Sequence, residues 1–266
     1  MTSISLGTAL VTGASTGMGA LYAQRLARRG YDLVLVARQR ERLNALARDI
    51  SNATGRAVEV LPADLATPEG MATVEHKLRH DASITLLVNN AGIGTHTPLL
   101  ASDVERMTQM VALNVTAPMR LAYAAVPGFV ARGRGALINI ASIVAVAPEV
   151  LNGVYGGSKA FLLAFSQSLQ HELAGQGVQV QAVLPGATAT DFWAAGGLPV
   201  EQLDARIVMR AEDMVDAALV GFDRGEAVTI PSLQAVAHWE AFEAARKALA
   251  PHLSSNTPAP RYAALH

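Results

Sequence analysis

A tyrosine and a lysine four residues apart carry the clearest chemical potential in this sequence. Residues spaced by four share one face of a helix, about 5–6 Å apart at Cβ, so the Lys159 ammonium could hold the pKa of the Tyr155 phenol below its usual value of about 10. A phenol tuned in this way becomes a usable proton donor. Ser142 lies thirteen residues before Tyr155 and adds a hydroxyl to the group.

The elements expected around these residues would bring them to one crevice. The apolar run at residues 136–141 predicts a buried strand, so Ser142 would lie just beyond its carboxyl end, where open α/β sheets bind ligands. A helix is predicted over residues 155–175. Taken alone, the same residues also fit an aromatic at a helix start, a solvated lysine and a turn serine. The rest of the chain decides between the two interpretations.

Composition and charge exclude several classes of function. The chain has 266 residues, of which 51% are hydrophobic, enough to bury the core of one α/β domain. Its formal net charge of −1 gives no field that favours nucleic acid or an anionic membrane, and the absence of Cys excludes thiolate metal sites. No apolar run reaches the roughly 20 residues of a membrane helix, and no signal-peptide pattern is present. We therefore expect a cytoplasmic protein with no membrane, nucleic-acid or metal partner.

A glycine-rich loop follows the first predicted strand. The apolar run Thr8–Thr12 predicts this strand, and the sequence GASTGMG at 13–19 leads into a helical pattern. Gly13, Gly17 and Gly19 would permit a tight turn and a close approach to a pyrophosphate, whose charge the free N–H groups at the helix start would meet. The GxxxGxG spacing differs from the GxGxxG fingerprint, so an ordinary glycine turn is the alternative.

The end of the second predicted strand indicates which dinucleotide would bind. This strand covers residues 31–37, and the position where an acidic residue would accept hydrogen bonds from the ribose 2′-hydroxyl of NAD is followed by Arg38. Asp32 lies at the opposite end of the strand. The planar cation of Arg38 suits the 2′-phosphate of NADP, so NADP is favoured over NAD. The alternative is that Arg38 and Arg40 are solvated charges at a helix start.

The remaining pattern alternates between strands and helices. Further strands are predicted at residues 57–61, 84–88, 178–184 and 227–230, and further helices at 40–54, 67–80, 103–132, 211–222 and 233–249. Asn114, on the otherwise apolar helix 103–132, needs a polar partner if it is buried. Residues 187–210 break the regular pattern and are interpreted as a substrate lid, and residues from about 250 to 266 as a loose tail.

Several of these signals occur together in one known family. The motifs are TGASTGMG (12–19), Asp64, NNAG (89–92), Asn114, Ser142, YxxxK (155–159) and PG (185–186). In order and spacing the sequence resembles the single-domain branch of the short-chain dehydrogenase/reductase family over about residues 8–230. The resemblance implies one Rossmann-type α/β domain over residues 1–266, with a doubly wound, seven-stranded parallel sheet in the order 3-2-1-4-5-6-7 and helices on both faces.

The resemblance also implies roles for individual residues. Tyr155 would be the general acid or base, Lys159 would lower its pKa and hold the nicotinamide ribose, and Ser142 would bind the substrate oxygen. Asn114 would keep a water that relays protons. The residues expected to contact NADP are Gly13, Ser15, Thr16, Gly17, Met18, Gly19, Arg38, Asp64, Leu65, Asn90, Ala91, Gly92, Tyr155, Lys159, Pro185, Gly186 and Thr188.

The implied activity is an NADP(H)-dependent oxidoreductase that interconverts a small or medium-sized apolar ketone, or an aldehyde, with its alcohol. The alternative is a non-catalytic protein that binds and senses NADP(H). A homodimer or homotetramer would pair helices 103–132 and 155–175. The expected substrate contacts are Val144, Val150, Leu151, Phe192 and Trp193, with Thr95 and His96 as further candidates. Of these, His96 is expected to be a surface loop residue and not a catalytic base.

Overall fold

A computed structural model describes residues 6–262 of the chain. These residues separate into two compact units, one ending at Ser232 and the other beginning at Leu233. The first unit contains all the motifs identified above. The expectation of one domain over the whole chain stays a prediction, and the two units are described separately.

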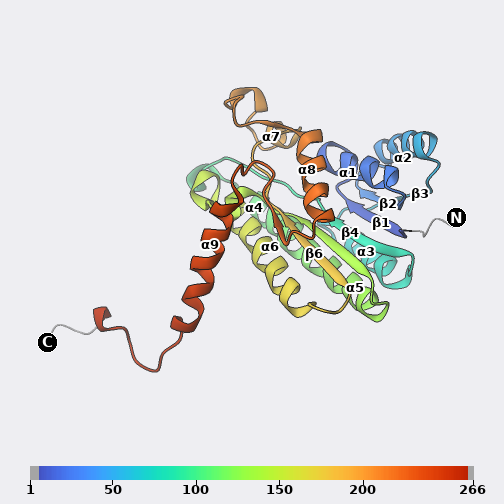
Figure 1. The fold of residues 1–266 in the computed structure, drawn as a ribbon. Coiled ribbons are helices and arrows are strands. Elements are labelled where there is room, and N and C mark those ends of the chain that lie inside the picture. The colour runs from blue at the N-terminus through green and yellow to red at the C-terminus, as the bar shows by residue number, and fades with distance from the viewer. Residues whose placement is uncertain (1–5, 263–266) are drawn as a thin grey trace. The chain divides into compact units, whose positions relative to one another are not determined.

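A parallel sheet forms the centre of the first unit (Figure 1). Its strands are β1 (Thr8–Thr12), β2 (Asp32–Ala37), β3 (Val58–Pro62), β4 (Ile84–Asn89), β5 (Gly135–Ile140), β6 (Val178–Val183) and β9 (Val228–Thr229). Seven strands are ordered β3-β2-β1-β4-β5-β6-β9, which confirms the predicted doubly wound topology. The order reverses between β1 and β4, so the carboxyl ends of these two strands border the crevice where such sheets bind ligands.

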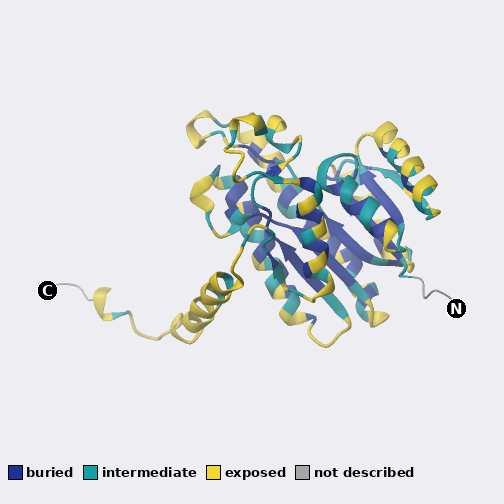
Figure 2. Ribbon diagram, turned by 45° about the horizontal axis from the view of Figure 1, so that its top comes forward, coloured by how far each residue is buried: buried dark blue, intermediate teal, exposed yellow. Residues whose placement is uncertain are grey.

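Helices cover both faces of this sheet. One core contains residues of α1 (Gly17–Arg28), α2 (Arg40–Thr54) and α8 (Ala211–Asp223). The opposite core contains residues of α3 (Pro68–His80), α5 (Ala117–Ala131) and α6 (Gly153–Glu172). Successive strand residues face opposite cores, so β2 is a continuous apolar run over residues 33–37, whereas β6 places Gln179 and Gln181 between its valines. Figure 2 shows the strands as the buried interior, with exposed residues on the outer sides of the helices.

The helix expected over residues 103–132 extends from Val104 to Ala131 and contains a π-helical turn. It consists of α4 (Val104–Val111), a π-helical turn at Ala112–Thr116, and α5. Pro118 has no backbone N–H, so the carbonyl of Asn114, four residues earlier, lacks its α-helical donor. A π-turn accommodates this break and is a common feature of functional sites. The prediction of one long helix is confirmed in its extent, but the π-turn that carries Asn114 was not predicted.

The segment expected to form a lid contains short regular elements. β7 (Thr188–Ala189) pairs in parallel with β8 (Met209–Arg210) in a separate two-stranded sheet. Between these strands, α7 (Phe192–Ala195) forms a single helical turn. The pairing joins the two ends of the segment, so residues 190–208 form a closed loop on a paired base.

The second unit contains α9 (Val236–Leu249), close to the predicted helix 233–249, and short 3₁₀ turns at Ala250–His252 and Pro260–Tyr262. Trp239 and Phe242 of α9 stack with ring centroids 5.4 Å apart. Part of the expected loose tail, residues 263–266, lies outside the described residues.

Candidate active site

A side-chain cap fixes the start of the helix that carries the tyrosine and the lysine. The Asn152 side chain accepts hydrogen bonds from the backbone N–H groups of Val154 and Tyr155, so α6 begins at Gly153. Asn152 is itself held, because its amide donates to the Thr97 carbonyl at 2.6 Å. An N-cap asparagine of this kind stabilises a helix by about 1 kcal/mol. Here it also sets the position of Tyr155 in the first turn.

Tyr155 is buried beside Ser142. Its side chain is 6% exposed, and Ser142 follows β5 at 8% exposure. Burial raises the pKa of Tyr155 to about 12, and the hydrogen bond from the Ser142 side chain opposes this shift. Removal from water disfavours the phenolate, which is why burial dominates. The phenol therefore keeps its proton at neutral pH.

Lys159 lies on the same face of α6 but does not act on Tyr155 as expected. Its Nζ donates to the Ile140 carbonyl at 2.8 Å and lies 5.8 Å from the centroid of the Tyr155 ring. Burial lowers the pKa of Lys159 to about 8, because the ammonium is taken out of water. The expectation that Lys159 lowers the pKa of Tyr155 is not met in this arrangement, since only Ser142 opposes the effect of burial.

Asn114 occupies the π-turn and bridges two other elements of the site. Its Oδ1 accepts from the backbone N–H of Ile93 at 3.0 Å, and its Nδ2 donates to the Ile93 carbonyl at 2.8 Å. The same amide donates to Ser158 Oγ on α6 at 3.1 Å. These bonds satisfy a side chain that is 1% exposed. Asn114 thus joins the loop after β4 to the helix that carries Tyr155.

The glycine loop is shaped for close approach to its backbone. Gly13 and Gly17 have φ of 65° and 55°, a region that favours glycine. A Cβ on Gly19 would lie 2.2 Å from the Gly13 carbonyl oxygen, so α1 can begin this close to the loop only without a side chain. Asn90 braces the loop, because its amide donates to the Thr12 carbonyl at 2.9 Å.

Most of the other predicted cofactor residues lie around the same edge of the sheet. Pro185 follows β6, and its carbonyl accepts from the backbone N–H of Ile143 at 3.0 Å. The hydroxyl of Thr188 donates to the Gly186 carbonyl at 3.1 Å. Asp64 accepts from the backbone N–H of Ala66 at 3.0 Å through one carboxylate oxygen. The other predicted residues are Ser15, Thr16 and Met18 at the glycine loop, buried Leu65 after β3, and Ala91 and Gly92 after β4.

Arg38 lies at the end of β2 with its guanidinium exposed. It makes no hydrogen bond or ion pair with any of residues 6–262. By contrast, Arg25 and Arg29 on the neighbouring α1 are paired with Asp216 and Asp223. The guanidinium of Arg38 is therefore available to an anionic ligand that reaches this end of the crevice.

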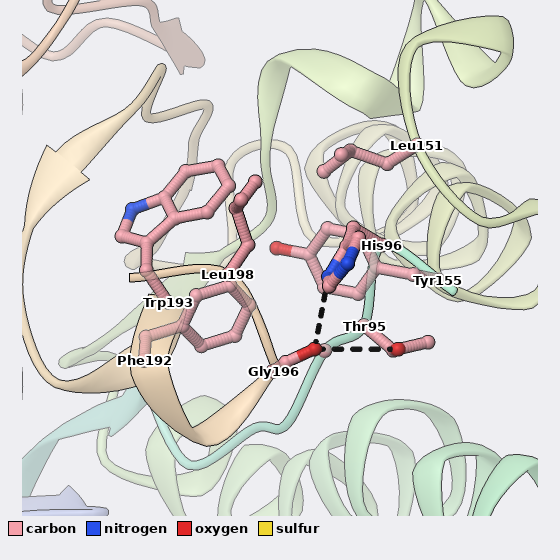
Figure 3. Close-up of a pocket in the computed structure, with 9 residues that line it drawn as sticks. Thr95, His96, Leu151, Tyr155, Phe192, Trp193, Gly196 and Leu198 are labelled. Carbon is pink, nitrogen blue, oxygen red and sulfur yellow. Dashed lines mark hydrogen bonds between the residues drawn. The ribbon is translucent and has the colours of Figure 1, made fainter. Parts of the chain in front are cut away.

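A small pocket opens beside Tyr155 (Figure 3). It is lined by Gly94, Thr95, His96, Leu151, Tyr155, Phe192, Trp193, Gly196 and Leu198. The Tyr155 hydroxyl points toward the side on which Trp193 and Leu198 lie. Leu151, Phe192 and Trp193 were expected along such a pocket, and His96 lines it although its side chain is exposed. Aromatic and aliphatic groups predominate in this wall.

Two expected substrate contacts are not in the lining. Val144 is buried and packs with Tyr155 beneath the pocket, whereas Val150 is 58% exposed. The run that contains them forms two 3₁₀ turns at Ile143–Ala145 and Pro148–Val150, which send the valines in different directions. Sequence spacing alone gives no indication of this local winding.

Comparison with known proteins agrees with this geometry. A sequence model described as short chain dehydrogenase matches residues 7–197. The chain belongs to the short-chain dehydrogenase/reductase family. A short-chain dehydrogenase from Sphingobium yanoikuyae in complex with NADPH is 48% identical, with a TM-score of 0.93 over 97% of this chain and 100% of that one. The bulky-bulky ketone specific alcohol dehydrogenase from Comamonas testosteroni is 42% identical, with a TM-score of 0.91 over 98% of this chain and 100% of that one.

Among curated proteins, an uncharacterized oxidoreductase from Myxococcus xanthus is 35% identical over 85% of this chain and 88% of its own length. The chain spans only 53–59% of the length of five other curated relatives that it matches. Similarity to those proteins therefore concerns only part of their length.

The residues of this short-chain dehydrogenase fit a bound nicotinamide dinucleotide. The glycine loop leaves space that a Cβ would fill, the N-cap residue Thr16 leaves the first N–H groups of α1 without a side-chain acceptor, and Arg38 is an unpaired cation at the ribose end. Within residues 6–262, no three His, Cys, Asp or Glu side chains gather in a way that could hold a metal ion. No helix in the same range is long and apolar enough to span a membrane.

Some residues of this site had no distinct signal in the sequence. Asn152 is one of several asparagines, and only its place before α6 reveals the cap. The hydroxyl of Thr12 accepts from the backbone N–H groups of Asn90 and Ala91, which joins β1 to the loop after β4. Gly94 and Leu198 enter the pocket from segments whose conformation the sequence pattern left open.

Proposed function

We propose that this protein is an NADPH-dependent carbonyl reductase that interconverts a ketone or aldehyde with its alcohol. The observation that carries the proposal is the buried, protonated Tyr155 phenol beside Ser142 at the wall of an apolar pocket. A group of this kind can donate a proton to a carbonyl oxygen during reduction. The short-chain dehydrogenase membership of the chain agrees with this chemistry.

The proposed roles follow from where each side chain lies. When bound, NADPH supplies the hydride. Ser142 holds the carbonyl oxygen, and Tyr155 gives it a proton as negative charge develops there. Lys159, with a pKa lowered to about 8 by burial, offers further N–H groups toward the cofactor ribose and a route for replacing the proton of Tyr155. Asn114 holds α6 to the loop after β4, and its π-turn suits a bound water in that relay.

The preference for NADP is proposed from Arg38. Its free guanidinium lies at the end of β2, where a 2′-phosphate would approach, and no carboxylate follows that strand. Two similar structures contain NADPH, that of the Sphingobium yanoikuyae enzyme and that of L-sorbose reductase from Gluconobacter frateurii. They support the proposal by analogy.

The substrate class is proposed from the pocket wall. Phe192, Trp193, Leu151 and Leu198 favour an apolar substituent on the carbonyl carbon, and the wall formed by α7 belongs to a loop that could open to admit it. The similarity to the bulky-bulky ketone specific enzyme of Comamonas testosteroni favours a larger ketone than the small or medium-sized one first expected. We infer a ketone that carries apolar groups on both sides.

A homo-oligomer is also inferred, because Val104, Val111 and Tyr123 are exposed apolar residues along α4 and α5. Light scattering at micromolar concentration would detect a dimer or tetramer, and a monomer would contradict this inference.

A panel of ketones and alcohols, followed by NADPH absorbance, tests the proposed activity. Turnover of ketones with apolar groups on both sides is expected, with much weaker turnover of acetone-sized compounds. The other candidate is an NADP(H)-sensing protein without turnover. Tight NADPH binding without turnover of any compound in the panel would favour that function and overturn the proposed one.

A further inference from the structure

Side chains from outside the lid hold the end of α7. The helix stops at Ala195, and Gly197, with φ of 91°, turns the chain away. Helix ends leave carbonyls without intrahelical donors. Here the Ala195 carbonyl accepts from Arg106 Nη2 at 2.7 Å, and the Gly196 carbonyl accepts from His96 Nδ1 at 3.1 Å. Both side chains supply N–H donors that the end of the helix lacks.

The same helical turn places Phe192 against the catalytic tyrosine. The rings of Phe192 and Tyr155 lie 5.7 Å apart between centroids. Phe192 also packs on Gly94, where an added Cβ would come within 2.3 Å of the ring. Since α7 is only four residues long, a contact at its last residue also fixes the ring at its first.

Other tethers lie within the lid itself. Trp193 Nε1 donates to the Thr188 carbonyl at 3.0 Å, and β7 pairs with β8. These bonds hold the lid together and pin its base. They do not fix the distance from Phe192 to Tyr155, because they do not reach across the pocket. Arg106 does, since it lies on α4, which packs through Met107 and Met110 into the cluster containing Tyr155.

We propose that Arg106 is a positioning residue for the reaction. Its guanidinium holds the end of α7, so that Phe192 forms a fixed wall beside Tyr155 and the ketone meets a pocket that is already shaped. This inference rests on the proposed function. Arg106 is itself exposed and is absent from the pocket lining, so it acts on the substrate only through the lid.

The first test is kinetic. Arg106→Met keeps the length of the side chain but removes the hydrogen-bond donors. It should raise KM for the ketone about fivefold to tenfold. The reason is that the apparent affinity for the ketone falls in proportion to the fraction of molecules in which the lid is closed. Since a saturating ketone refills the pocket and closes the lid, kcat should stay within about twofold. Arg106→Lys retains a cationic donor and should recover most of the loss. Arg48→Met, on an exposed and unpaired arginine of α2, is the matched control.

The second test reports on the lid without turnover. The chain has two tryptophans, so Trp239→Phe leaves Trp193 in the lid as the sole reporter. Arg106→Met should then increase acrylamide quenching of Trp193 about twofold, because an open lid exposes the indole. This readout separates the two proposals, since quenching can change even if the protein reduces no ketone. Unchanged quenching, or a loss in kcat with KM unaltered, would overturn the role given to Arg106.

Discussion

The catalytic group and the residues proposed to select cofactor and substrate occupy opposite environments. Asn114, Ser142, Tyr155 and Lys159 are all between 1% and 8% exposed and are held by bonds to the central strands and α6. Arg38 and Arg106 are exposed, and the aromatic wall sits on a four-residue helix. The reacting groups therefore share the rigidity of the core. The selecting groups can change with little effect on the fold.

The largest effect should come from the buried group. Tyr155→Phe removes the transferable proton but keeps the ring packed, so turnover should fall by a factor on the order of 10² or more while NADPH affinity changes little. Steady-state kinetics and a fluorescence titration with NADPH measure the two quantities. Turnover retained in this variant would remove Tyr155 from the proposed mechanism.

The next largest effect should come from changing the exposed Arg38, which is proposed to select the cofactor. Ala37→Asp combined with Arg38→Ala should reverse the cofactor preference, because the carboxylate repels a 2′-phosphate and accepts from a 2′-hydroxyl. A charge-assisted contact supports a starting preference of roughly tenfold to a few hundredfold for NADPH. The measurement is the ratio of kcat/KM for NADPH over NADH in parent and variant. A ratio insensitive to both substitutions would leave Arg38 as a solvated charge, with Arg40 the next candidate.

Burial of the Lys159 ammonium should also lower the free energy of unfolding of the protein. Burial lowers the pKa of Lys159 to about 8, so in the cofactor-free protein its charge disfavours the folded state at neutral pH. Lys159→Met should therefore raise the free energy of unfolding at pH 7 by about 2 kcal/mol while abolishing turnover.

The pH dependence of folding stability follows from the lowered pKa of Lys159. Above its ordinary pKa of 10.5 the amine is neutral in both states, and the stability present there is lost as pH falls through 10.5 to 8. The advantage of Lys159→Met should therefore shrink as pH rises from 8 toward 10.5. Denaturant unfolding at pH 7 and pH 10 tests this, and a variant that is less stable at both values would show that the bond to the Ile140 carbonyl outweighs the buried charge.

The smallest effect should come from the lid. Gly94→Ala places a Cβ where the Phe192 ring now lies, but that ring is the far end of a side chain and can rotate away. We expect about a threefold change in kcat/KM for bulky ketones and no change in NADPH affinity. Gly157→Ala, an exposed α6 position with no atom within 4 Å of an added Cβ, is the matched control. A large loss of NADPH affinity in Gly94→Ala would show that the lid and the cofactor loop are not independent.

Much of the sheet and the catalytic group could be predicted from local signals. Several strands are apolar runs, and the predicted strand ends lie within one residue of the observed ones. Tyr155 and Lys159 fall on one face because helical spacing requires it. The π-turn was not predicted. Pro118 has no backbone N–H, so its presence in a helical pattern indicates that one helical hydrogen bond is lost. The sequence does not show which hydrogen bonds replace it.

Contacts between distant segments were beyond sequence patterns. Arg106 and Ala195 are 89 residues apart, and no periodicity relates them. The sequence predicted a lowered pKa for Tyr155, whereas burial raises it. Helical spacing predicts that Lys159 lies near Tyr155, but it does not show that the Lys159 amine donates to the Ile140 carbonyl. Val144 and Val150 are absent from the pocket lining, and the short 3₁₀ turns that place them leave no repeating pattern in the sequence.

The π-turn at Ala112–Thr116 has a consequence for how the length of this chain can vary. A turn closed by i→i+5 bonds holds one residue more than an α-helical turn. Deleting one residue within it would restore a regular α-helical turn and leave α4 and α5 facing as they do now, because the extra residue is held inside the widened turn. The deletion would remove the widened turn from which Asn114 reaches Ile93 and Ser158. A one-residue difference in chain length at this stretch should therefore be tolerated by the fold but should disrupt the hydrogen bonds of Asn114.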